Sequence, residues 1–175
     1  MKLRRWRNMI KLLGCVMILF ACLGIASGGC KRLKERVRTL ERLEDLLAVF
    51  SGEVRYGMRP LPQLFERLGR MEGGAGFAAA SREMELRDGR GAGECFCAGM
   101  KEGYPDLPGE DLCVLLTLGE GLGVCDGETQ CRQIDAVRER LGVQCEKARE
   151  TAIKNTRLYQ GLGLLGGLFF ILLLL

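Results

Sequence analysis

The amino-acid sequence predicts an all-α protein: a membrane-anchored antiparallel helical bundle with a transmembrane helix at each end. Two long segments carry apolar residues at steps of three or four along one side and charged residues along the other, as amphipathic α-helices do. Two further segments, one toward each end of the chain, are apolar over a length that can cross a bilayer. No segment alternates apolar and polar residues as a half-buried β-strand would.

These patterns divide the chain into three parts. Residues 1–29 are predicted to be a basic flank followed by a transmembrane helix. Residues 30–157 are predicted to form the soluble helical bundle, which is long enough for a single core. Residues 158–175 are predicted to be a second transmembrane helix.

The composition argues against several kinds of chemistry. The 175 residues include no histidine, which removes the commonest general base, the commonest zinc ligand and the Ser-His and Cys-His nucleophile pairs. A net charge of +4 is mild and does not by itself indicate nucleic-acid binding. We therefore expect a protein that is not an enzyme, with no cofactor, no metal and no nucleic-acid partner.

The nine cysteines favour reduced thiols over a disulfide framework. Cys15 and Cys22 lie in the first predicted membrane segment, and the remaining seven are an odd number. We interpret these as reduced thiols in a cytosolic compartment, with Cys113, Cys131 and Cys145 at core positions. The Cys95-Phe96-Cys97 sequence has no second cysteine pair, so it indicates packing and not a metal site.

The N-terminal segment has two interpretations. Basic residues precede the apolar run 12–26: Lys2, Arg4, Arg5, Arg7 and Lys11. A retained membrane helix is the favoured interpretation. The alternative is a secreted lipoprotein that is anchored through Cys30 and binds an extracellular ligand, although Ser27 stands where such sites have a large aliphatic residue.

The soluble part opens with an amphipathic helix over residues 31–56. Its apolar positions are Leu33, Val37, Leu40, Leu43, Leu47, Phe50 and Val54. Pro60 ends this helix, and a short helix with Leu61, Leu64, Phe65 and Leu68 follows. Residues 69–93 contain weak helical periodicity around Phe77, but the many glycines favour a flexible linker at 89–93. Residues 94–101 and 112–118 are predicted as a short helix and a buried helix.

The last arm begins near Gln130 and is predicted to be one long helix. Its buried face consists of Cys131, Ile134, Val137, Leu141, Cys145, Ala148 and Ala152. The eighteen uncharged residues 158–175 then span roughly 27 Å at ~1.5 Å per residue, close to a bilayer core of about 30 Å. Glycines four residues apart in the two apolar segments indicate helix packing in lipid: Gly24, Gly28, Gly163 and Gly167.

Basic residues beside the apolar segments are candidates for contact with anionic lipid headgroups. They are Lys31, Arg32, Lys34, Arg36, Lys154 and Arg157. The basic residues before the last segment also tip the charge balance toward a cytosolic bundle with both termini across the membrane.

Two motifs resemble a known family. Residues 53–61 read Glu-Val-Arg-Tyr-Gly-Met-Arg-Pro-Leu and end the first amphipathic helix. Residues 118–126 read Leu-Gly-x-x-Leu-Gly-x-x-Asp and lead into the long arm, which closes on the glycine-containing apolar segment. Nearly end to end, the chain resembles the stage III sporulation protein AB family of endospore-forming bacteria.

The resemblance implies a mother-cell membrane protein with a cytosolic bundle of about six helices, similar to the F-type inner-membrane proteins of type II secretion and type IV pilus machines. It also implies work within a channel-like apparatus that joins mother cell and forespore. The implied partners are other stage III sporulation proteins, including a cytosolic ATPase. Membrane lipids are expected as partners from the basic residues beside the apolar segments, and self-association into an oligomer is a further expectation.

Four residues of the turn at 53–61 are candidates for binding such a partner: Glu53, Arg55, Tyr56 and Arg59. In a purely structural account, Gly57 ends the helix in a conformation open to glycine, and Tyr56 packs its ring. In a docking account, the turn stands roughly 38 Å from the helix start at ~1.5 Å per residue, within reach of a soluble partner. Both accounts stay open at the level of sequence.

Overall fold

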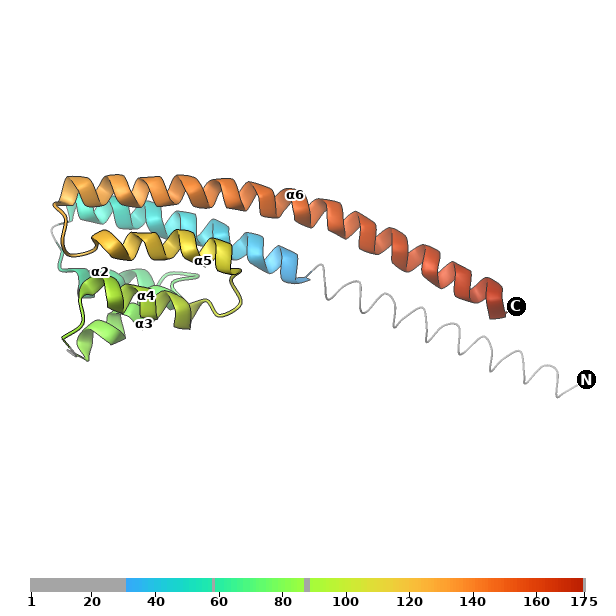
Figure 1. The fold of residues 1–175 in the computed structure, drawn as a ribbon, viewed down its shortest axis with the longest axis horizontal. Helices are drawn as coiled ribbons and strands as arrows, with labels where there is room; N and C mark the ends of the chain where they lie inside the picture. Colours follow the sequence, from blue (N-terminus) through green and yellow to red (C-terminus); the bar gives the residue numbers. More distant parts are fainter. Residues whose placement is uncertain (1–30, 58, 87–88, 175) are drawn as a thin grey trace, which may run out of the picture. The chain divides into compact units, whose positions relative to one another are not determined.

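The computed structural model describes residues 31–57, 59–86 and 89–174, with side chains described up to Leu158 and at Gly161. Within these residues all regular secondary structure is helical (Figure 1). A helix over residues 31–56 precedes α2 (Leu61–Gly69), α3 (Ala75–Glu85), α4 (Ala92–Gly103), α5 (Gly109–Leu116), a 3-10 helix η1 (Thr117–Gly121) and α6 (Gly127–Leu174). The predicted all-α fold is confirmed.

The chain forms two compact units. The larger, which we call the bundle unit, is Arg36–Lys147. The other, which we call the terminal unit, combines Met1–Glu35 with Ala148–Leu175.

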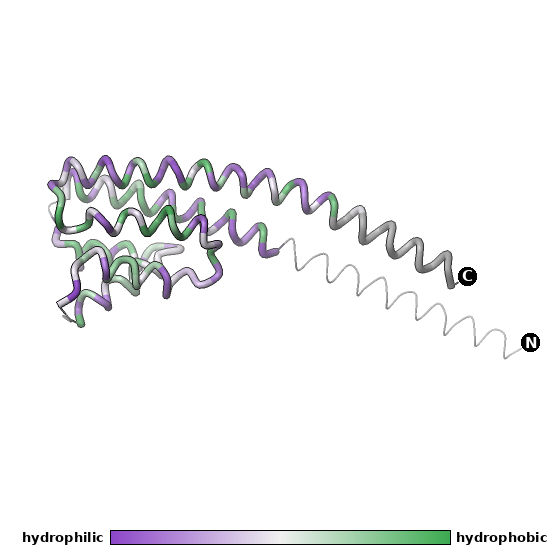
Figure 2. The backbone as a smooth tube through the Cα atoms, in the orientation of Figure 1, coloured by the Kyte–Doolittle hydropathy of each residue, from purple (hydrophilic) through white to green (hydrophobic). Residues whose placement is uncertain are grey.

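The two predicted amphipathic faces are buried as the periodicity requires. All seven apolar positions predicted on α6, from Cys131 to Ala152, are buried. On the 31–56 helix, Leu40, Leu43, Leu47 and Phe50 are completely buried, and the predicted positions nearer the ends are half-buried. Apolar and polar residues alternate along both helices with the helical period (Figure 2).

Four phenylalanines form the centre of the bundle unit. Phe50, Phe65, Phe77 and Phe96 come from four different helices and are fully buried. Their ring centroids lie 5.6 to 6.1 Å apart, mostly edge to face. Each such pair adds about 0.5–1.5 kcal/mol beyond the burial of apolar area, so this cluster fixes four helices around one point.

The stretch predicted as weakly helical contains a well-packed helix, α3. Its buried residues include Gly76, Phe77 and Ala80. A Cβ atom at Gly99 of α4 would lie 2.3 Å from the Ala80 nitrogen, and one at Gly103 would lie 2.3 Å from the Gly76 Cα. The glycines therefore allow close helix packing, which outweighs their low helix propensity.

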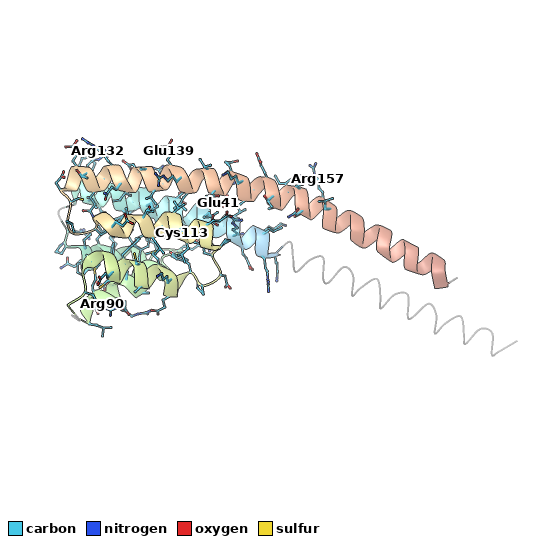
Figure 3. All side chains as sticks on the ribbon, viewed as in Figure 1. Glu41, Arg90, Cys113, Arg132, Glu139 and Arg157 are labelled. Atoms are coloured by element: carbon cyan, nitrogen blue, oxygen red, sulfur yellow. The ribbon has the colours of Figure 1, made fainter. Side chains whose placement is uncertain are left out.

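The predicted buried helix at 112–118 is α5 and the start of η1, but it is only partly buried. Leu115 and Leu118 are buried, whereas Cys113 is exposed on α5 (Figure 3). The prediction of Cys113 as a core residue is therefore wrong. Cys131 and Cys145 are buried as predicted, and all six described cysteines are free thiols.

Within the part of the chain that the structure describes, no helix combines the length and the apolar character needed to cross a membrane. The segment 1–29, with Gly24 and Gly28, lies outside that part. The side chains of 158–175 also lie outside it except at Leu158 and Gly161, although the α6 backbone is helical to Leu174 through Gly163 and Gly167. The two transmembrane helices remain predictions.

Candidate functional site

Three connections of the bundle unit meet at one end, which we call the loop end. Their described residues are 53–57 with 59–61, 86 with 89–91, and 119–126. A Cβ atom at Gly123 would lie 3.2 Å from the Ala92 Cβ and 4.0 Å from the Leu61 Cδ1, so the last connection adjoins the starts of α2 and α4 (Figure 1). Gly123 has a φ of 80°, a conformation that glycine adopts without strain.

Each of these connections exposes one large apolar side chain. Tyr56 is 82% exposed, Leu86 68% and Val124 85%. Large apolar side chains that gather on a surface mark sites of protein or membrane contact more often than scattered ones do. The loop end is therefore the candidate interaction site of the bundle unit.

Glu53 is the structural centre of the first connection. Its side chain is only 18% exposed and pairs with Arg67 and with Arg59, whose Nε lies 3.6 Å from Oε2. Its backbone carbonyl accepts a 2.8 Å hydrogen bond from the Gly57 N–H. Of the four partner-binding candidates, Glu53 is therefore the one that holds the turn together.

The structural account of Gly57 and Tyr56 needs correction. Gly57 is not among the glycines with positive φ; a Cβ atom there would instead lie 2.6 Å from the Glu53 carbonyl oxygen. Glycine is thus required for space and not for a left-handed conformation. The ring of Tyr56 does not pack into the fold, since most of it is exposed.

Arg55 and Arg59 flank the exposed tyrosine. The Arg55 Nη2 lies 3.3 Å from Asp135 Oδ2 on α6, and both side chains are about half exposed. Interactions with the Cys131 side chain and then the Tyr56 hydroxyl raise the pKa of Arg55. The structure thus brings all four candidates to the loop end, with Tyr56, Arg55 and Arg59 facing solvent; Arg90 and Arg132 lie at the same end (Figure 3).

Sequence reasoning missed Leu86 and Val124. Leu86 is followed by a polar connection, and Val124 lies in a glycine-rich one near Leu122 and Cys125, so neither belongs to a helical period that draws attention to it. The sequence did contain one signal. Val124 lies between Gly123 and Asp126, in a turn without the apolar spacing of a buried helix face, so an exposed position was to be expected.

Arg36 differs from the other membrane-surface candidates because it pairs with carboxylates inside the bundle unit. Its Nε and Nη2 donate to the two carboxylate oxygens of Asp111 at 2.8 and 3.0 Å, and Nη2 also donates to Glu110 at 2.7 Å. Asp111 is fully buried, and its hydrogen bond raises the pKa of Arg36. This ion pair ties the 31–56 helix to α5, so the Arg36 charge is already neutralised. The other five candidates are exposed.

Cys97 and Asp126 have structural partners within the bundle unit. Cys95 is buried, and the Cys97 thiol lies 3.7 Å from the Leu116 carbonyl oxygen, where burial raises its pKa. Asp126 caps α6, and hydrogen bonds from Thr129 lower its pKa. Among the described residues, no group of three His, Cys, Asp or Glu side chains is placed to hold a metal ion.

The geometry defines an all-α helical-bundle protein with three exposed large apolar side chains, Tyr56, Leu86 and Val124, in the connections at one end of the bundle unit. The family described as stage III sporulation protein AB matches residues 11–175. The chain belongs to this family, as its motifs predicted, and membership implies a role in sporulation.

Two individual comparisons agree with this assignment. Stage III sporulation protein AB of Bacillus subtilis (strain 168) is 27% identical over 172 residues, which is 95% of this chain and 100% of the relative. A solved structure of stage III sporulation protein AB (SpoIIIAB) superimposes with a TM-score of 0.62 at 22% identity, over 68% of this chain and 97% of the other. At that identity the structure supports the fold alone.

Proposed function

We propose that the protein is a non-enzymatic membrane component of the secretion-like channel apparatus that links mother cell and forespore. In this proposal the segments 1–29 and 158–175 anchor it in the mother-cell membrane, and the bundle unit faces the cytosol. The family assignment and the two uncharged apolar segments of the sequence support it.

The bundle docks partner proteins, such as the ATPase of the apparatus, through the loop end. The observation that carries this proposal is the 82% exposure of Tyr56 beside Arg55 and Arg59. Tyrosine and arginine are enriched among the residues that dominate binding energy. Their substitution weakens binding most where the interface excludes water. Leu86 and Val124 add apolar surface at the same end.

The test replaces exposed residues in the full-length protein. Tyr56→Ala and Val124→Ser should leave the free energy of unfolding within about 0.5 kcal/mol of the unsubstituted protein, because neither side chain is buried. Recovery of other stage III proteins by crosslinking in sporulating cells should fall at least about tenfold, as expected for residues at the centre of an interface. Spore counts should fall with it.

Val143→Ser is the matched control, because Val143 is 53% exposed on α6, away from the three connections. It should change neither partner recovery nor spore counts. Glu53→Ala is a poor probe, since it removes the carboxylate that holds Arg59 and Arg67. Full partner recovery with both Tyr56→Ala and Val124→Ser would rule out docking through the loop end.

A further inference from the structure

The two units of the chain carry opposite net charge. The terminal unit contains eleven Lys and Arg residues and two Asp and Glu residues, which gives +9. The bundle unit contains fifteen basic and twenty acidic residues, which gives −5, and the two values account for the +4 of the whole chain. A division this large within 175 residues indicates that the two units meet different surroundings.

The basic residues of the two units also differ in their partners. In the described part of the bundle unit, nine arginines form ion pairs with carboxylates. Five exposed basic residues of the terminal unit, which we call the terminal cations, form no ion pair with another described residue. The terminal cations are Lys31, Arg32, Lys34, Lys154 and Arg157.

Each group of terminal cations places like charges side by side on its helix, and a single carboxylate four residues from a lysine, Glu35 or Glu150, offsets only part of that charge. Lys31 and Lys34 are three residues apart on the 31–56 helix, and Lys154 and Arg157 are three apart on α6. Like charges at this spacing share a helix face and cost a few tenths of a kcal/mol. An anionic surface would offset the repulsion between these like charges and attract both of them.

The sequence positions of these residues favour a lipid surface over other anions. The uncharged segment 158–175 begins directly after Arg157, and the apolar run 12–26 ends shortly before Lys31. Clusters of Lys and Arg immediately beside membrane segments bind anionic headgroups.

We propose that the terminal cations bind anionic phospholipid headgroups, so that the protein selects phosphatidylglycerol over neutral phosphatidylcholine. This inference rests on the proposed membrane attachment and adds a lipid preference to it. The bundle unit, with its charge of −5, does not share the preference because it is repelled by the same surface.

The experiment uses the full-length protein in phosphatidylcholine vesicles that contain traces of spin-labelled phosphatidylglycerol or spin-labelled phosphatidylcholine. Electron paramagnetic resonance gives the fraction of each lipid that the protein immobilises. We expect a preference of at least about fivefold for phosphatidylglycerol at low salt, since one basic residue near an anionic surface contributes ~1 kcal/mol. At about 1 M salt the preference should disappear, because the screening length falls to ~3 Å.

Two substituted proteins and one matched control assign the preference to residues. Lys154→Gln with Arg157→Gln, and separately Lys31→Gln with Arg32→Gln and Lys34→Gln, should each lower the preference several-fold. The control is Arg138→Gln with Arg140→Gln, which removes two exposed charges from the same helix within the bundle unit. It should keep the preference of the unsubstituted protein.

The outcomes separate this inference from the proposed function. Equal immobilisation of both lipids would overturn the inference and leave membrane attachment intact, because immobilised phosphatidylcholine alone reports insertion. No immobilisation of either lipid would contradict both. An equal loss in the control would overturn the role of the terminal cations. Binding of duplex DNA through the same residues, without a lipid preference, would assign them to nucleic acid.

Discussion

Arg36 and Asp111 form the most buried ion pair among the described residues. The Asp111 carboxylate is inaccessible to solvent, the Arg36 side chain is 21% exposed, and the two are joined by hydrogen bonds of 2.8 and 3.0 Å. Two parallel bonds between a guanidinium and a carboxylate fix distance and orientation together. The pair therefore sets how α5 lies against the 31–56 helix.

Removing Arg36 alone should cost far more than removing both partners. Arg36→Met alone should lower the free energy of unfolding by about 3–5 kcal/mol, because it leaves the buried Asp111 carboxylate without its partner. Asp111→Ala should cost less, because Arg36 keeps its hydrogen bond to Glu110 and is partly exposed. The double variant Arg36→Met with Asp111→Leu should recover most of the loss caused by Arg36→Met. Urea unfolding of the full-length protein in detergent, followed by circular dichroism, measures all three values.

The exposed pair Arg70–Glu66 provides the comparison, since its side chains are 79% and 52% exposed. Arg70→Met should change the free energy of unfolding by less than about 0.5 kcal/mol. Losses that simply add in the Arg36 and Asp111 double variant would show that the pair has no special role.

Single residues were the hardest to assign from the sequence. Arg36 stands in a basic cluster and so indicated a lipid contact, but its partner lies 75 residues away and nothing local reveals it. Tyr56 and Arg59 were found because they belong to a motif. The inward position of Glu53 was not found, since it depends on Arg67, a residue of the next helix.

At the scale of elements, Tyr104 connects the end of α4 to the turn before α3. Its ring is buried, and its hydroxyl donates a hydrogen bond to the Gly73 carbonyl oxygen. Burial raises the pKa of Tyr104 from 10 to about 12. The folded protein therefore holds this hydroxyl protonated over a range in which the unfolded chain releases its proton.

Because the pKa of Tyr104 is raised in the folded protein, its contribution to stability decreases as the pH becomes alkaline. The contribution of Tyr104 is complete below pH 10 and is lost as the pH rises to about 12. A shift of two pKa units corresponds to roughly 2–3 kcal/mol. Tyr104→Phe should lose about 1 kcal/mol at neutral pH, with the hydrogen bond, but should lack this part of the alkaline decline.

Thermal unfolding of both proteins between pH 9 and pH 12 measures the difference. Every other ionisable group is shared, so subtracting the two curves isolates Tyr104. If stability fell equally with pH in both proteins over this range, ionisation of the Tyr104 hydroxyl would not be coupled to unfolding.

The strength of the periodic signal decided which elements were predictable. The 31–56 helix and α6 are long and amphipathic, and their buried residues follow from the sequence. The extent of α3 could not be predicted from the sequence, because small residues stand where large apolar side chains would have revealed the helical spacing. The partial exposure of α5 was missed because an apolar run does not reveal which of its sides is covered.

At the scale of the whole molecule, exposed and buried thiols allow the membrane orientation to be tested. Among the described cysteines Cys113 is exposed, Cys97 and Cys125 are half-buried and the other three are buried, so Cys113 is the one that an impermeant maleimide would reach most readily. With a cytosolic bundle, Cys113 should be labelled only after lysis. Mass spectrometry of the labelled full-length protein measures this.

Cys113→Ser is the control and should remove that label while the buried thiols stay unreactive. Labelling of Cys113 in intact cells, to the level reached after lysis, would place the bundle on the outer side of the membrane. It would also remove the cytosolic ATPase from the possible partners.

The glycines at the contact between α3 and α4 limit which base changes in the gene the protein can accommodate. A glycine codon begins with two guanines, and every substitution at either base adds a side chain or stops the chain. At Gly76, Gly99 and Gly103 such a side chain would meet atoms 2.3 or 2.4 Å from its Cβ, so the two helices would have to separate. Only third-base changes leave this contact intact. These helix glycines are thus less free to vary than Gly91 in the connection between α3 and α4, where an added Cβ atom meets nothing within 4 Å.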